Sequence, residues 1–140
     1  MKIGITFSAF DLLHAGHVAM LEEAKSVCDY LIVGLHIDPS LERSNKNKPI
    51  QSLIERQIQL KGCKYVDEII CYETEQDLLN LLNMVNWDVR IIGEEYKGKV
   101  FTGSTEFDNP HSTKEIYYNS RRHGFSSTDL RQRFINDEIR

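Results

Sequence analysis

The sequence predicts a doubly wound, Rossmann-like α/β domain with a five-stranded parallel sheet and flanking helices. Strand-like and helix-like segments alternate along the whole chain. The run Tyr30–His36 is almost continuously apolar, which is typical of a parallel strand covered on both faces. With 140 residues, 41% of them hydrophobic, and no internal repeat, we expect a single domain over residues 1–140.

The first half of the chain begins with a strand-like run over residues 2–6. A histidine-containing turn over residues 10–15 then leads into a helical pattern that places Val18, Leu21 and Ala24 on one face. This order predicts a strand, a loop and a helix.

After the apolar run described above, residues 38–49 form a polar, cationic stretch that we interpret as a mobile loop. Ser52 and Glu55 have the spacing of a capping box and predict a helix that continues through Leu60. The helix therefore follows the loop directly.

The second half of the chain continues the alternation. The predicted elements are a strand over 66–71, a helix over 75–85 opened by Thr74, a strand over 89–92 ending in Gly93, a strand over 115–119 and a helix starting over 126–129. The irregular segment 97–113 is interpreted as an active-site lid. Because parallel strands place their carboxyl ends at one edge, the loops after the strands are expected to hold the site.

The composition excludes several classes of function. A net charge of −4 and a pI near 5.7 argue against a protein that coats nucleic acid or a membrane surface. Cys28, Cys63 and Cys71 are odd in number and widely separated, so neither a disulfide framework nor a zinc knuckle is expected. A cytoplasmic location is the default expectation.

The strongest motif is the segment FDLLHAGH over residues 10–17. His14 and His17 are three residues apart at a predicted helix start, so both can face one ligand. Gly16 leaves room for a phosphate near the helix N-terminus, where backbone amides and the helix dipole favour anions. A nonfunctional surface pair and a metal site are the alternatives. No third ligand with suitable spacing is present, so no metal site is predicted.

The second motif is RRHGFSST over residues 121–128. Arg121 offers a planar fork suited to phosphate, and hydroxyls in the first turn of the following helix can hold phosphate oxygens. These hydroxyls belong to Ser126, Ser127 and Thr128. Lys46 and Lys48 lie on the cationic loop and could close over the leaving pyrophosphate. An ordinary helix cap and an ordinary solvated loop are the alternatives.

Both motifs, in this order, resemble those of the cytidylyltransferase and related nucleotidyltransferase superfamily, and within it the glycerol-3-phosphate cytidylyltransferases. The resemblance extends to the segments DYLIVGLHID, IERQIQLKGCKYVDEII and WDVRIIGEEYKGK. It implies transfer of CMP from CTP to a small phosphorylated alcohol by direct attack at the α-phosphorus, without a covalent enzyme intermediate. It also implies Mg²⁺ as cofactor and a homodimer.

The resemblance also assigns residues to roles. It implies catalytic roles for His14, His17, Lys46 and Arg121. The expected nucleotide-binding residues are Thr6, Phe7, Ser8, Asp11, Gly16, Lys48, Glu94, Arg121, Ser126, Ser127 and Thr128, and Arg56 and Lys64 are candidates for binding substrate phosphates. Two alternatives stay open: Asp11 could fix the turn by bonding backbone amides, and Arg56 could pair with Glu55 or Asp67.

Three other functions remain open at this point. An ATP-dependent adenylyltransferase uses the same scaffold and differs in base selectivity. A nucleotide-binding module without turnover would keep the fold alone. A metal-dependent hydrolase built on the two histidines would retain zinc and need no nucleoside triphosphate.

Overall fold

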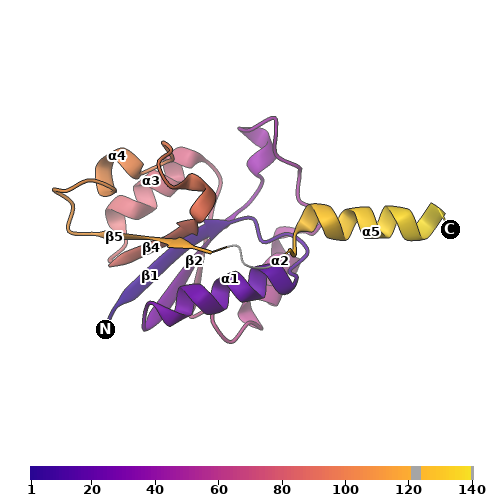
Figure 1. The fold of residues 1–140 in the computed structure, drawn as a ribbon, viewed down its shortest axis with the longest axis horizontal. Helices are drawn as coiled ribbons and strands as arrows, with labels where there is room; N and C mark the ends of the chain where they lie inside the picture. The colour runs from indigo at the N-terminus through magenta and orange to yellow at the C-terminus, as the bar shows by residue number, and fades with distance from the viewer. Residues whose placement is uncertain (121–123, 140) are drawn as a thin grey trace.

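A five-stranded, entirely parallel sheet forms the centre of the molecule (Figure 1). The computed structural model describes residues 1–120 and 124–139. The strands are β1 (Ile3–Ser8), β2 (Tyr30–His36), β3 (Glu68–Tyr72), β4 (Val89–Gly93) and β5 (Glu115–Asn119), in the spatial order β3-β2-β1-β4-β5. This confirms the predicted fold class. The strand order reverses direction between β1 and β4, where ligands bind in folds of this class.

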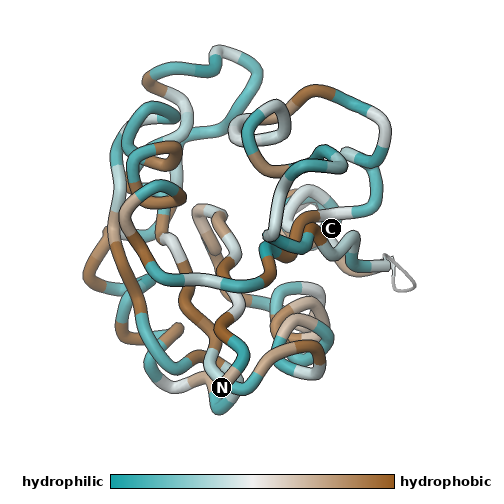
Figure 2. The backbone as a smooth tube through the Cα atoms, turned by 90° about the vertical axis from the view of Figure 1, so that its left-hand side faces the viewer, coloured by the Kyte–Doolittle hydropathy of each residue, from teal (hydrophilic) through white to brown (hydrophobic). Residues whose placement is uncertain are grey.

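Helices cover both faces of the sheet. The helices are α1 (Ala15–Ser26), α2 (Leu53–Lys61), α3 (Glu75–Met84), α4 (Ser104–Phe107) and, projecting away from the sheet, α5 (Ser127–Ile139), with 3₁₀ turns η1 (Pro39–Leu41) and η2 (Glu94–Tyr96). One buried cluster joins α1 and α2 to the sheet through Leu21, Leu60 and Val33. A second joins α3 to the opposite face through Leu78 and Ile32. Figure 2 shows hydrophobic residues along the inner strands and hydrophilic residues on the outer loops.

Helices α2 and α3 each begin at a capping box. The sequence predicted the box at Ser52 and Glu55 and the start of a helix at Thr74. Ser52 Oγ accepts from the Glu55 amide at 3.2 Å, and the Glu55 carboxylate accepts from the Ser52 amide at 2.9 Å. Thr74 and Asp77 make the same reciprocal pair at the start of α3. These bonds satisfy amides that a helix N-terminus leaves without partners, which explains where α2 and α3 begin.

The third strand begins later than the sequence predicts. It was expected over 66–71, but β3 spans Glu68–Tyr72. The Asp67 carboxylate accepts from the Leu31 amide at 2.8 Å and pairs with Lys25. A side chain therefore bonds the Leu31 amide ahead of the ladder, and the strand starts two residues later than predicted.

The segment 97–113 packs against the sheet. The Arg90 guanidinium lies over the rings of Phe7 and Phe101, 5.2 Å from each centroid, and donates to the Thr102 carbonyl. Burial lowers the pKa of Arg90 to about 10, so it stays charged at neutral pH. Thr102 Oγ1 also donates to Glu75 at 2.9 Å. These contacts anchor the segment, and its role as a lid stays a prediction.

Helix α5 projects away from the sheet at the C-terminal end of the chain (Figure 1). Phe134 and Ile135 on this helix are 65% and 50% exposed. Within residues 1–120 and 124–139, no helix combines the length and the apolar character needed to cross a membrane.

Candidate active site

The histidine turn between β1 and α1 is organised by its own backbone. His14 is the N-cap of α1, and its Nδ1 accepts from the Gly16 amide at 3.0 Å. The His14 amide in turn donates to His17 Nδ1 at 3.3 Å. The two rings stack with centroids 3.9 Å apart. The sequence forms this capping box with histidines where Ser and Glu are usual, so both rings are fixed before any ligand binds.

These two hydrogen bonds determine which ring nitrogen carries the proton. An Nδ1 that accepts a backbone N–H must present its lone pair, so in the neutral ring the proton lies on Nε2. This holds for His14 and for His17. Both imidazoles are therefore hydrogen-bond donors at Nε2, which suits them to phosphate oxygens.

The His17 ring is neutral at physiological pH. Burial, followed by the neighbouring His14 ring, lowers the pKa of His17 from 6.5 to about 4, although Asp11 acts in the opposite direction. The Phe10 ring lies 5.4 Å from the His17 ring. His17 thus acts as a neutral donor whose ring orientation is set by packing.

The turn that leads into the histidines is strained. Phe10 and Leu12 have φ values of 47° and 52°, in the left-handed region that non-glycine residues adopt at a cost of about 1 kcal/mol or more. Phe10 is 1% exposed, and the Leu12 amide donates to Gln51 Oε1 at 2.7 Å. Burial of Phe10 and this bond hold the turn in its strained conformation.

The Asp11 carboxylate bonds to the segment before α2 and to α5. Asp11 is 8% exposed, and its carboxylate accepts from the amides of Ile50 and Gln51 at 2.8 and 2.9 Å. It also pairs with Arg131 at 2.8 Å. These bonds agree with the alternative in which Asp11 bonds backbone amides, and its expected role in nucleotide binding stays a prediction.

The second motif lies beside the first. His14 Nε2 and Ser127 Oγ are 3.0 Å apart, although 113 positions separate them. Ser126 Oγ accepts from the Asp129 amide at 3.0 Å and caps α5, while Thr128 is exposed in its first turn. The structure therefore brings the helix N-termini of α1 and α5 together. Arg121 lies outside the described residues, so its predicted role stays a prediction.

Two residues of β1 have structural contacts that the sequence did not predict. Thr6 is 3% exposed, and its Oγ1 donates to the Ile91 carbonyl at 2.9 Å. The Phe7 ring packs edge-on against Tyr72 with centroids 5.6 Å apart. Thr6 thus joins β1 to the neighbouring β4, and Phe7 reaches across β2 to β3; the expected nucleotide contacts of both residues stay predictions. Ser8 and Glu94 follow the expected placement at the carboxyl ends of β1 and β4.

Arg56 is a buried structural residue. It is 2% exposed, and its guanidinium donates to the carbonyl oxygens of Gln51, Ala9, His36 and Ile37 at 2.7 to 3.2 Å. None of these partners is Glu55 or Asp67, and a contact of Arg56 with a substrate phosphate stays a prediction. Its planar fork joins the loops after β1 and β2 to the start of α2.

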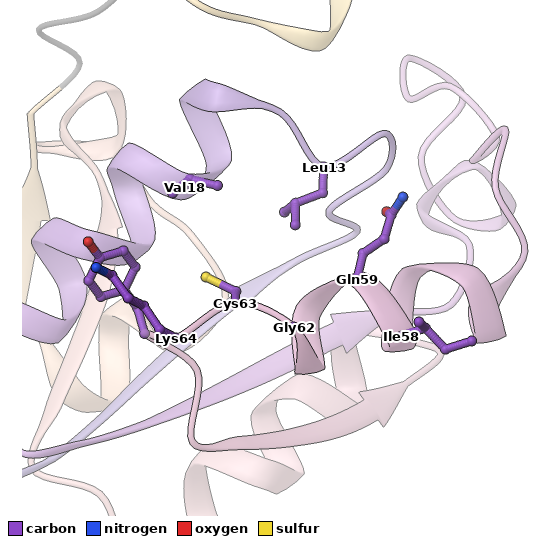
Figure 3. A pocket seen from close by; sticks show the side chains of 8 residues that line it. Leu13, Val18, Ile58, Gln59, Gly62, Cys63 and Lys64 are labelled. Atoms are coloured by element: carbon purple, nitrogen blue, oxygen red, sulfur yellow. The ribbon is translucent and has the colours of Figure 1, made fainter.

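The three lysines of the predicted site are exposed. Lys46 and Lys48 lie on the loop before α2, as expected. Lys64 lines an open hollow of about 450 Å³ between α1 and α2, together with Leu13 and Val18 (Figure 3). The Lys64 Nζ lies 5.2 Å from the centroid of the Tyr65 ring. The proposed phosphate contacts of all three lysines stay predictions.

Sequence reasoning missed three residues that build the site. Gln51 and Arg131 hold the histidine turn through Leu12 and Asp11. Glu23 of α1 accepts from the Tyr117 hydroxyl and from Ser120, at the entry to the second motif. Each is an ordinary polar residue on a helix or loop, and its partners here lie far along the chain.

A metal site in a protein needs several ligating side chains close together. Within residues 1–120 and 124–139, no three His, Cys, Asp or Glu side chains lie close enough together to hold a metal ion.

Comparison with known proteins gives one family. The profile of the cytidylyltransferase-like family matches residues 5–133. Glycerol-3-phosphate cytidylyltransferase of Bacillus subtilis is 34% identical over 133 residues, which cover 94% of this chain and 96% of that protein. The bifunctional protein HldE of Caulobacter sp. (strain K31) is 39% identical over 105 residues.

That match covers 74% of this chain and 21% of HldE, so the chain spans about a fifth of the length of this relative. Among solved structures, the lipopolysaccharide core biosynthesis protein of Thermoplasma volcanium superposes with a TM-score of 0.67 at 24% identity. The superposition covers 85% of this chain and 97% of that protein, which supports the fold.

Proposed function

Because the chain belongs to the cytidylyltransferase-like family and is a nucleotidyltransferase, we propose that it transfers CMP from CTP to glycerol-3-phosphate or a related polyol phosphate. The products are a CDP-alcohol and pyrophosphate. We also propose that residues 1–140 act as one nucleotidyltransferase domain. The homodimer implied by the family resemblance stays a prediction.

The observation that carries the proposal is the meeting of the two motifs at His14 and Ser127. Two helix N-termini converge there, and each contributes dipole and amide donors that favour anions. The Nε2–H groups of His14 and His17 add two donors from a preorganised cap. A triphosphate is the ligand that such a group of donors suits.

The transfer needs little proton chemistry from the protein. A phosphate monoester has a second pKa of about 6, so the acceptor is largely ionised at neutral pH. One of its oxygens forms a bond to the α-phosphorus of CTP, and the bond to the β-phosphate oxygen breaks as pyrophosphate leaves with that electron pair. The neutral His17 donates a hydrogen bond to the developing charge and remains protonated at Nε2.

Lys46 and Lys48 complete the charge of the site in this proposal. Both side chains are exposed on the loop before α2. Their ammonium groups can therefore move to the β- and γ-phosphates without being drawn out of the protein interior. Arg121, in the second motif, would add a bidentate contact. Positioning and electrostatic stabilisation then account for the rate.

We propose Mg²⁺ as the ion that accompanies the triphosphate. Asp11, beside the histidines, already accepts from Ile50, Gln51 and Arg131, so it is not offered to a metal. The ion would be held by phosphate oxygens and water, as is usual for Mg²⁺. It would neutralise charge on the departing pyrophosphate.

An assay of pyrophosphate release tests the proposal. Each of CTP, ATP, GTP and UTP is offered with Mg²⁺ and one acceptor from a panel of glycerol-3-phosphate, other polyol phosphates, phosphocholine, phosphoethanolamine and a sugar phosphate. We expect release that depends on CTP and a polyol phosphate. His14→Ala and His17→Ala should reduce kcat by about 100-fold or more, as loss of a transition-state donor does.

Three results would contradict parts of the proposal. Release that depends on ATP would assign the chain to the adenylyltransferases, and a preference for another acceptor would replace the polyol phosphate. Full activity of His17→Ala would remove His17 from the catalytic group.

A further inference from the structure

The first two turns of α5 dock on the histidine turn through two polar contacts. Ser127 Oγ lies 3.0 Å from His14 Nε2, and Arg131 Nη2 lies 2.8 Å from Asp11 Oδ2. Ser127 and Arg131 are four residues apart and share a face of the helix. Beyond this face the helix projects from the body (Figure 1), with Phe134 65% exposed. These two contacts therefore decide where the first turn of α5 lies.

The Arg131–Asp11 ion pair is better shielded from solvent than the Arg133–Asp129 ion pair on the same helix. The side chains of Arg131 and Asp11 are 24% and 10% exposed, whereas those of Arg133 and Asp129 are 64% and 55% exposed. An ion pair that solvent reaches freely contributes little, while a shielded pair contributes more. Arg131 and Arg133 thus form a matched comparison on one helix.

Asp11 would oppose nucleotide binding if its charge were left uncompensated. The carboxylate lies in the turn that carries His14 and His17, at the place where we propose that a triphosphate binds. Two amide donors and the Arg131 guanidinium converge on it. A like charge at short range in a shielded site is strongly unfavourable, and the guanidinium cancels it.

We propose that Arg131 is a positioning residue of the transferase site: its ion pair with Asp11 holds Ser127 at His14 and removes the carboxylate charge from the path of the triphosphate. The inference rests on the proposed function, because it names a residue that prepares the same site. Arg131 acts through Asp11 and Ser127 and does not contact the reacting atoms.

The test compares the wild-type protein with Arg131→Met, Arg131→Gln, Arg131→Lys and Arg133→Met. Three quantities are measured: the Kd of CTP with Mg²⁺ by calorimetry, KM and kcat for pyrophosphate release, and hydrogen exchange of the amides of residues 126–137. Thermal melting of each variant serves as the control that the domain remains folded.

We expect Arg131→Met and Arg131→Gln to weaken CTP binding by about 10- to 100-fold, the range for loss of a charged hydrogen bond. Their amides over 126–131 should exchange faster. Arg131→Lys should stay within about threefold of wild type because it keeps the charge, and Arg133→Met should match wild type.

Two results would overturn the proposal. One is that Arg131→Met matches Arg133→Met in CTP affinity and in exchange. The other is that Arg131→Gln binds CTP as well as Arg131→Lys, which would show that the charge is not needed. If the wild-type protein binds no CTP, the proposed function fails by itself; hydrogen exchange of Arg131→Met against Arg133→Met then decides whether the ion pair positions α5.

Discussion

Acidification should destabilise the protein through His17. The unfolded chain takes up a proton on this imidazole near pH 6.5, whereas the folded protein takes it up only near pH 4. Between these values the unfolded state binds more protons, so stability falls as the pH falls and the loss ends below pH 4. At about 1.36 kcal/mol per pH unit, the loss is about 2.5 kcal/mol at pH 4.5 and about 3.4 kcal/mol at most.

Urea unfolding at pH 7.5, 6.0, 5.0 and 4.5 measures this loss when wild type is compared with His17→Asn. The asparagine side-chain oxygen can accept from the His14 amide as Nδ1 does, but it does not titrate. Other groups contribute equally to both proteins, so the difference between the two pH profiles isolates His17. Parallel profiles, or an NMR titration that places the pKa of His17 near 6.5, would refute the reasoning.

Three further substitutions separate catalytic from structural roles. Lys46→Ala should raise KM for CTP by about tenfold at an unchanged melting temperature, because the side chain is exposed; unchanged kinetics would return it to an ordinary loop. Arg56→Met should lower the free energy of unfolding by about 3 kcal/mol or more in urea titrations, since it leaves buried carbonyl oxygens unpaired, and a smaller loss would contradict this role. Gly34→Ala should lower the free energy of unfolding by about 1 to 3 kcal/mol, because an added Cβ would lie 2.2 Å from the Phe7 ring. A melting temperature equal to that of wild type would show that the ring moves aside without cost.

The order of elements was predictable because it depends on local patterns. The apolar run of β2, the capping box at Ser52 and the strand ending at Gly93 each follow from residues within a few positions of one another. The error at β3 arose from a long-range contact, the Asp67 carboxylate bonded to Leu31, which no local pattern reports.

The candidate site was predictable only in part for the same reason. His14 and His17 belong to one short motif, and their capping box is a local feature. Arg56 has the residue type of a phosphate ligand, and the sequence gives no sign that four carbonyl oxygens surround it. A charged residue on a helix is predicted to be exposed unless the hydrogen-bond partners of its charged group are known.

The sequence by itself determined the fold class, the family resemblance and the two motifs, because periodicity, caps and motif spacing are encoded in neighbouring residues. Only the tertiary structure decided that Thr6, Asp11 and Arg56 serve the scaffold, and that Ser127 meets His14 and Arg131 meets Asp11. These contacts join residues up to 120 positions apart. The physical reason is that a buried polar group must find a partner wherever the fold places one, and that place is not written in its local sequence.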